Sequence, residues 1–236
     1  MEYIRVTKEN LEKEHICCAI SNNKDVQVSS KKVWLSDRFD EGLVFLKSVE
    51  RGKCFIEYIP AENAWVPIKA DGYMYIDCLW VSGSFKGHGY STDLLNACID
   101  DSKEKGKKGL CILAAAKKKP FLADPKFLKY KGFTVCDEAD NGIQLWYLPF
   151  VTDADRPHFR ECAKHPHIEE KDMCCITPAS VRSMRNMFRF WSRPPKRMLY
   201  HSMRFISKAE KKRRVLRRRS QIMRFSMTGN ILRMSR

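Results

Sequence analysis

The segment 74–91 places a glycine turn between an apolar strand and an amphipathic helix. Gly87, His88 and Gly89 form this turn, after a strand predicted over Tyr73–Val81 and before a helix predicted over 89–105. The start of a helix exposes unpaired backbone N–H groups at the positive end of the helix dipole. Glycine lets the backbone approach a ligand with no Cβ in the way. The junction therefore predicts a binding site for an anion such as a diphosphate.

The elements around this turn predict the fold class. A turn signal at 70–72 predicts a hairpin between a strand over 64–69 and the strand Tyr73–Val81. The short apolar run 109–116 is typical of a buried parallel strand. Only the unit formed by Tyr73–Val81, the helix and this run needs a parallel crossover. The order predicts an α+β sandwich, with a mixed, mostly antiparallel sheet flanked by helices and the β-α-β unit at its centre.

The remaining elements follow from capping residues and periodicity. Thr7 can cap a helix over 7–20, and Ser36 can cap a second helix that Gly52 ends. The other expected elements are strands over 1–6 and 53–59, a helix over 121–131, and a closing antiparallel pair over 133–136 and 143–148.

The chain combines two very different compositions. Residues 1–171 hold 26 basic and 26 acidic residues, whereas residues 172–236 hold 18 basic and 2 acidic residues, which accounts for the whole net charge of +16. We therefore expect a domain over 1–150, a linker over 151–171 and a basic, poorly ordered tail over 172–236. A secretion signal and a long apolar run are both missing from the sequence, so we expect a cytoplasmic protein without a membrane span.

Residues 1–150 resemble the N-acetyltransferases of the GNAT superfamily. The resemblance rests on the strand, turn and helix start over 73–91 and on Lys131, Gly132 and Phe133. It implies an acyltransferase that passes the acetyl group of acetyl-CoA directly to a primary amine in a ternary complex. It also implies that main-chain groups hold the pantetheine arm and the diphosphate of the donor. The residues expected to bind the donor are Leu79, Trp80, Val81, Ser84, Phe85, Lys86, Gly87, His88, Gly89, Tyr90 and Ser91.

The sequence departs from the family pattern at two positions. Ser84 stands where family members usually carry Gln or Arg, and Lys86 is close enough in sequence to replace the lost positive charge. Leu128 stands where many members carry a Tyr that protonates the departing thiolate. Tyr130 is near in sequence, but it lies on another face of the predicted helix.

Two carboxylates are the candidates for the base that such a reaction needs. Acetyl transfer requires a neutral amine, because an ammonium group has no lone pair, and a carboxylate can accept the proton. Asp77 lies midway along the central strand, and its apolar neighbours Ile76 and Cys78 predict that it points to the opposite face from both. Glu57, on the preceding strand, is the weaker second candidate. The alternative for Asp77 is a solvated strand carboxylate or the cap of a neighbouring loop.

A cluster of cysteines and histidines near the end of the linker does not predict a metal site. Its members are Cys162, His165, His167, Cys174 and Cys175. Their spacing fits no familiar zinc pattern, and Pro166 separates the two histidines. We expect no bound metal.

Three functions remain open for the whole chain. The first is the acetyltransferase, with acetyl-CoA and an unidentified amine as partners. The second is a nucleic-acid-binding protein that acts through its basic tail, which would bind in a salt-sensitive way. The third is a GNAT fold that binds an acyl-CoA without turnover, which Ser84 and Leu128 keep open.

The abrupt change after Lys171 suggests a second explanation for the tail, a shift of the reading frame. Back-translation of residues 171–187 in the shifted frame permits GYVLYYTSQCPFNAKY, and the end of the chain permits NYALFYDGKY followed by TNE. Both strings resemble a thioredoxin-like domain that follows the acetyltransferase in one GNAT subfamily. The basic charge would then reflect codon content rather than a nucleic-acid partner.

We predict that the gene contains a frameshift near the codon of Lys171. Resequencing the gene from independent isolates measures this directly, and a single inserted or deleted base should restore the thioredoxin-like sequence. An uninterrupted frame that keeps the basic tail in every isolate would contradict the hypothesis.

Overall fold

A seven-stranded sheet with the order β1-β2-β3-β5-β6-β8-β7 forms the centre of the fold. The computed structural model describes all residues except 17–24, 121, 140–141, 165–172, 176–222 and 226–236. The strands of the sheet are β1 (Tyr3–Val6), β2 (Val44–Ser48), β3 (Cys54–Pro60), β5 (Tyr73–Val81), β6 (Gly109–Ala115), β7 (Thr134–Glu138) and β8 (Ile143–Pro149). Within this sheet only β5 and β6 run parallel, which confirms the predicted mostly antiparallel α+β fold.

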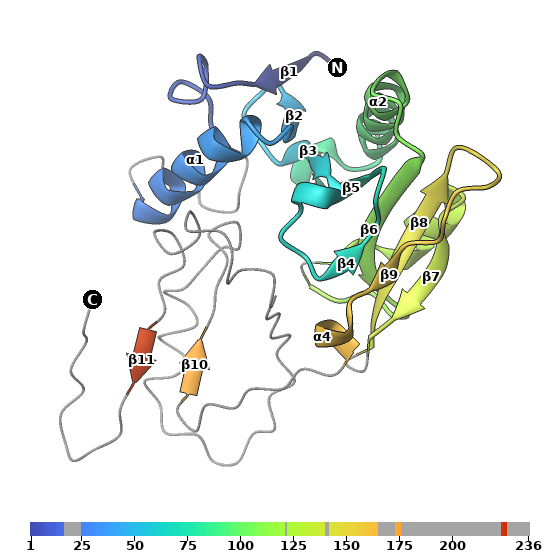
Figure 1. Ribbon diagram of the computed structural model, residues 1–236. Helices are drawn as coiled ribbons and strands as arrows, with labels where there is room; N and C mark the ends of the chain where they lie inside the picture. Colours follow the sequence, from blue (N-terminus) through green and yellow to red (C-terminus); the bar gives the residue numbers. More distant parts are fainter. Residues whose placement is uncertain (17–24, 121, 140–141, 165–172, 176–222, 226–236) are drawn as a thin grey trace.

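Helices cover both faces of this sheet (Figure 1). Helix α1 (Val26–Phe39) packs on one face through Leu35, next to the stacked rings of Phe45 and Phe55. Helices α2 (Tyr90–Glu104) and α3 (Pro125–Tyr130) pack on the other face. Since neighbouring residues of a strand point to opposite faces, an inner strand contributes to both cores, as β3 does through Phe55 and Ile56. We call these faces the α1 side and the α2 side.

The unit that carries the glycine turn forms as predicted. Strand β5 leads through the short 3-10 helix η2 (Gly83–Phe85) and the turn into α2, and β6 returns parallel to β5. Helix α2 buries Leu94, Leu95 and Cys98 against the sheet. Gly106, with a φ of +65°, follows its C-terminus. Local sequence signals are enough to predict this β-α-β unit, because the capping residues, the helical periodicity and the strand composition all indicate the same elements.

The elements predicted between the first strand and β3 are wrong. The described residues of the expected helix over 7–20 form turns, because the Asn10 side chain accepts a hydrogen bond from Thr7 N at 2.8 Å and donates to Arg5 O at 2.9 Å. The helix expected from Ser36 to Gly52 is replaced by the end of α1 and by β2. Gly42, with a φ of +88°, separates the two elements. A glycine of this conformation commonly ends a helix, but the apolar periodicity continues past it and so predicted a longer helix.

The predicted hairpin between 64–69 and β5 does not form. Only Ile68–Lys69 is extended (β4), and it pairs with β9 (His158–Phe159) rather than with β5. The 3-10 helix η1 (Ala61–Asn63) follows β3 directly. The expected helix over 121–131 is shorter and begins at Pro125, where the Asp124 side chain caps it by accepting from Lys126 N at 3.0 Å.

The segment predicted as a linker packs onto the domain in its described part. Phe159 of β9 is buried on the α1 side, and Phe159 N donates to the Asp137 carboxylate at 2.8 Å. The short helix α4 (Glu161–Lys164) follows. The tail contributes two described strands, β10 (Met173–Cys175) and β11 (Met223–Phe225), which pair antiparallel with each other. The rest of the predicted tail lies outside the described residues, as does the end of the predicted linker with His165 and His167.

Among the described residues, no helix has the length and apolar character needed to cross a membrane.

Candidate active site

Asp77 is the extra residue of a β-bulge in β5. In the pairing of β3 with β5, Glu57 lies opposite Cys78 while Tyr58 lies opposite Ile76, so Asp77 has no partner position on β3. A bulge bends its strand and increases the local twist. The alternation of side chains is therefore shifted by one residue at Asp77.

The two parallel strands separate at the same place. The ladder between β5 and β6 runs from the pair Tyr73–Gly109 to the pair Ile76–Ile112 and includes no later residue of β5. Strand β5 nevertheless continues to Val81, still paired with β3. This part of β5, which includes Leu79 and Val81, therefore presents an edge with which β6 does not pair. Such an edge can accept an extended ligand as an additional strand.

The bulge also decides which face Asp77 occupies. Ile76 packs on the α2 side, whereas Cys78 and Trp80 pack on the α1 side. Asp77 interacts with Glu57 on the α1 side, and it is exposed. The expectation that Asp77 points away from both Ile76 and Cys78 is therefore correct for Ile76 and wrong for Cys78. The sequence shows no bulge, so a regular alternation was the natural assumption.

Glu57 is buried beside a lysine that the sequence did not single out. Its side chain is 2% exposed, and both of its carboxylate oxygens accept from Lys31 Nζ, at 2.7 and 3.0 Å. Lys31 comes from α1, the helix that the sequence analysis misplaced. Burial raises the pKa of Glu57 to about 7, the Lys31 charge lowers it, and the nearby Asp77 carboxylate raises it again. A carboxyl with such a pKa can exchange protons near neutral pH.

The turn before α2 provides an open surface of backbone. Gly87 and Gly89 have φ values of +84° and +81°, and a Cβ added at either would meet nothing within 4 Å. Gly89 caps α2 without any side-chain hydrogen bond to the first helical N–H groups. Ser84 and Lys86 are exposed on the same loop, and the ring of His88 stacks on that of Tyr90. These groups can approach an anionic ligand without a steric barrier.

Phe85 anchors this loop rather than facing solvent. Its ring is buried against Gly52, where a Cβ would lie 2.1 Å from Phe85 Cε2. Gly52 N in turn donates to His15 Nε2 at 3.1 Å. Burial lowers the pKa of His15, which favours the neutral ring that can accept this bond. The expected contribution of Phe85 to donor binding therefore rests on its main chain.

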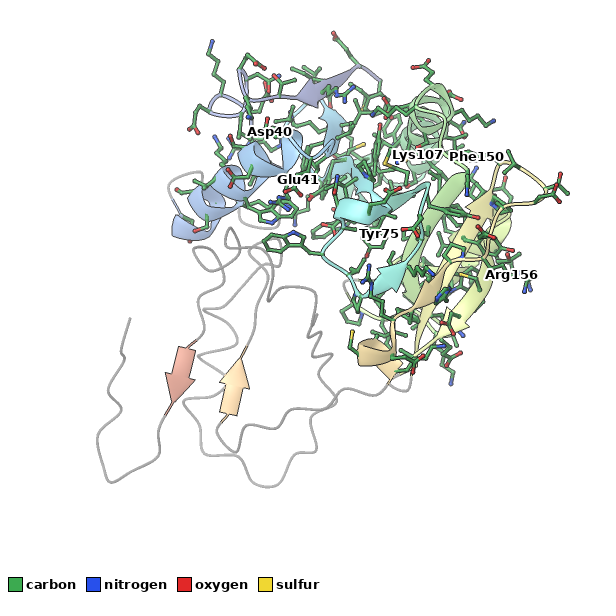
Figure 2. The ribbon with its side chains drawn as sticks, viewed as in Figure 1. Asp40, Glu41, Tyr75, Lys107, Phe150 and Arg156 are labelled. Atoms are coloured by element: carbon green, nitrogen blue, oxygen red, sulfur yellow. The ribbon has the colours of Figure 1, made fainter. Side chains whose placement is uncertain are left out.

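Leu128 stands at the position where many GNAT members carry a tyrosine, so no phenol is present there. Leu128 is 1% exposed within the α2-side core, whereas Tyr130 is 80% exposed on the outer face of α3. The structure thus confirms that the two residues lie on different faces. Tyr75, labelled in Figure 2, is a second tyrosine of β5 and lies in the interior on the α1 side. Burial and the charge of Asp77 raise its pKa well above the usual value.

We predict that Gly52→Ala loosens the loop before α2. The new methyl group must displace the Phe85 ring, and such overpacking costs roughly 1–3 kcal/mol. Hydrogen exchange of the amides over 84–91 should become faster, as mass spectrometry of peptic fragments can measure. Gly106→Ala is the control for a general loss of stability, because it strains a backbone with positive φ at the other end of α2 and places its methyl group in open space. Unchanged exchange over 84–91 in Gly52→Ala would contradict the anchoring role.

We also predict a loss of stability with rising pH that depends on Glu57. The native state retains the Glu57 proton up to about pH 7, whereas the unfolded chain releases it near the ordinary pKa of 4.5. Because the native state binds more protons in this window, the free energy of unfolding falls as the pH rises through it. Urea denaturation should show a weaker decline in Glu57→Gln than in the wild type. Parallel declines in the two proteins would show that the native pKa of Glu57 is not raised.

Comparison with known proteins identifies the family of the chain. The model of the acetyltransferase (GNAT) family matches residues 9–120. The chain is 48% identical over 172 residues to YoaP of Bacillus subtilis, described as an uncharacterized N-acetyltransferase, and the match covers 72% of this chain and 68% of YoaP. Among the residues that the structure describes, no group of three or more His, Cys, Asp or Glu side chains is placed so that it could hold a metal ion.

Solved structures with similar folds are more distant. YncA of Salmonella typhimurium, a putative acetyltransferase with its cofactor acetyl-CoA, is 18% identical with a TM-score of 0.46, over 66% of this chain and 96% of that one. A ribosomal-protein-alanine N-acetyltransferase of Brucella melitensis is 16% identical with a TM-score of 0.45, over 64% of this chain and all of that one. The degree of identity to YoaP, together with the family match, shows that the chain belongs to the GNAT family of acetyltransferases.

Proposed function

We propose that this acetyltransferase moves the acetyl group of acetyl-CoA to a primary amine by direct transfer in a ternary complex. The observation that carries the proposal is the separation of β5 from β6 at Ile76, so that β6 does not pair with β5 beyond Asp77. The same strand leads directly into the open glycine turn at the start of α2. A strand-like arm and a diphosphate are joined in the same order in acetyl-CoA.

The donor would lie along β5 and end at α2. Main-chain groups of Leu79, Trp80 and Val81 can bind the pantetheine arm as a neighbouring strand would. Backbone N–H groups over 84–91 and the dipole of α2 can stabilise the diphosphate. Lys86 supplies a positive charge on this loop, where Ser84 supplies none. This arrangement points the thioester toward the bulge at Asp77.

The carboxylates of Asp77 and Glu57 would accept a proton from the amine acceptor. An ammonium group must lose one proton before its nitrogen can attack, and it loses a second as the C–N bond forms and the C–S bond breaks. Asp77 is exposed and can accept the first proton, while the buried Glu57 beside it can store that proton near neutral pH. The second proton is the one that converts the departing thiolate into a thiol. The missing phenol at Leu128 means that this last transfer uses the acceptor nitrogen or water.

We predict that alanine at both Gly87 and Gly89 weakens acetyl-CoA binding by at least about tenfold. Each methyl group adds bulk where the backbone should touch the donor, and each strains a backbone with positive φ. Calorimetric titration of acetyl-CoA into the full chain measures the effect. Gly106→Ala is again the control, because it has a similar backbone strain without lying on the loop.

The outcomes separate the possible functions. Binding that only the double variant loses, followed by transfer to an amine in an acceptor screen, would support the enzyme. Binding without transfer to any amine would support the non-catalytic acyl-CoA-binding fold. A folded chain that does not bind acetyl-CoA would overturn the proposal.

A further inference from the structure

Lys31 is a charged side chain held almost entirely inside the domain. It is 6% exposed, and its ammonium group donates to both oxygens of Glu57, which is itself 2% exposed. An ion pair with this burial loses much of its attraction to the cost of desolvating both groups. Stability is therefore a weak reason for placing a lysine here rather than an apolar residue.

The tryptophan one turn further along α1 fixes the position of this ammonium group. Lys31 Nζ lies 4.0 Å from the centroid of the Trp34 ring, a cation–π distance. Trp34 is held in turn by an edge-to-face contact with Trp65, with ring centroids 6.2 Å apart. The ammonium group of Lys31 is thus held in place by hydrogen bonds to the Glu57 carboxyl and by its contact with the Trp34 ring. This geometry leaves little freedom for Glu57 to turn away from Asp77.

The charged and titratable groups that face Glu57 come from α1 and β5. Lys31 faces it from α1, while Asp77 and the neutral phenol of Tyr75 face it from β5. On β2 its partner in the sheet is the apolar Phe45. Lys31 is the positive charge that opposes both burial and the repulsion from Asp77, the two influences that keep Glu57 protonated.

We propose that Lys31 is a positioning residue for acetyl transfer: it holds the Glu57 carboxyl beside Asp77 and supplies the charge that allows Glu57 to ionise inside the domain. Glu57 then takes up, by way of the exposed Asp77, the proton that the acceptor ammonium loses, and between turnovers it releases this proton to solvent by the same route. This role rests on the proposed function of the site. Trp34 contributes by keeping the ammonium group in place.

The neighbouring lysine of α1 provides a matched control. The Lys32 side chain is 9% exposed, and its ammonium group donates to Glu12 O at 2.7 Å and lies 3.7 Å from the Glu12 carboxylate. Lys31→Met and Lys32→Met each remove one buried positive charge from the same turn of α1. Only the removal of Lys31 should change the protonation of Glu57.

The decisive measurement is the pKa of Glu57 by carbon NMR on the full chain labelled at the glutamate carboxyl carbon. Glu57→Gln identifies the resonance, and no acetyl-CoA or acceptor is needed. Lys31→Met should raise this pKa from about 7 by roughly one unit or more, a tenfold gain in proton affinity. Lys31→Arg should restore the wild-type value to within about half a unit, since it keeps the charge. Lys31→Gln replaces Lys31→Met where the latter does not fold, because it keeps a donor and loses the charge.

The result separates this proposal from the proposed function. A raised pKa in Lys31→Met or Lys31→Gln, with Lys31→Arg and Lys32→Met at the wild-type value, supports the positioning role. A pKa that stays within a few tenths of the wild type, or an equal shift in Lys32→Met, overturns it. Either outcome is independent of the acetyl-CoA titration, whose failure would overturn only the acetyltransferase proposal.

Discussion

One inserted residue in β5 determines the arrangement of the whole candidate site. Without the bulge at Asp77, β5 would keep its regular alternation beside β3, and Asp77 and Cys78 would not share the α1 side. The bulge lies where the ladder between β5 and β6 ends, so the strand edge beyond β6 and the pair of carboxylates occur together. The end of the β5–β6 ladder thus lies beside the charged groups that the proposed chemistry uses.

Local signals predicted the part of the site that is local in sequence. The strand, the glycine turn and α2 are consecutive, and the positive φ of Gly87 and Gly89 agrees with their residue type. The contact between Lys31 and Glu57 joins residues 26 positions apart and depends on a helix that the periodicity placed too late. Phe39 and Leu43 fit one helical face, and Gly42 between them was the only local sign that the helix had ended.

Burial changes the meaning of residues that look ordinary in the sequence. Glu57 was the weaker of two candidate bases because nothing around it in the sequence sets it apart. Packing on all sides gives it a pKa of about 7, which no pattern of neighbouring residues could reveal. Gly52 was expected to end a helix, whereas it provides space for the Phe85 ring and a hydrogen bond to His15. Both roles arise from contacts between distant segments.

The two adjacent lysines of α1 connect this helix to different parts of the protein. Lys31 binds the sheet at Glu57, and Lys32 binds the main chain of Glu12 in the segment that follows β1. A rigid-body movement of α1 away from the sheet must therefore separate a buried ion pair as well as apolar contacts. Such a movement becomes less costly as the pH rises, because the pKa of Glu57 is raised in the packed layer and falls toward 4.5 when water reaches the carboxyl. Any opening of this layer would therefore be coupled to the protonation state of Glu57, and a rise in pH would favour access to the α1 side.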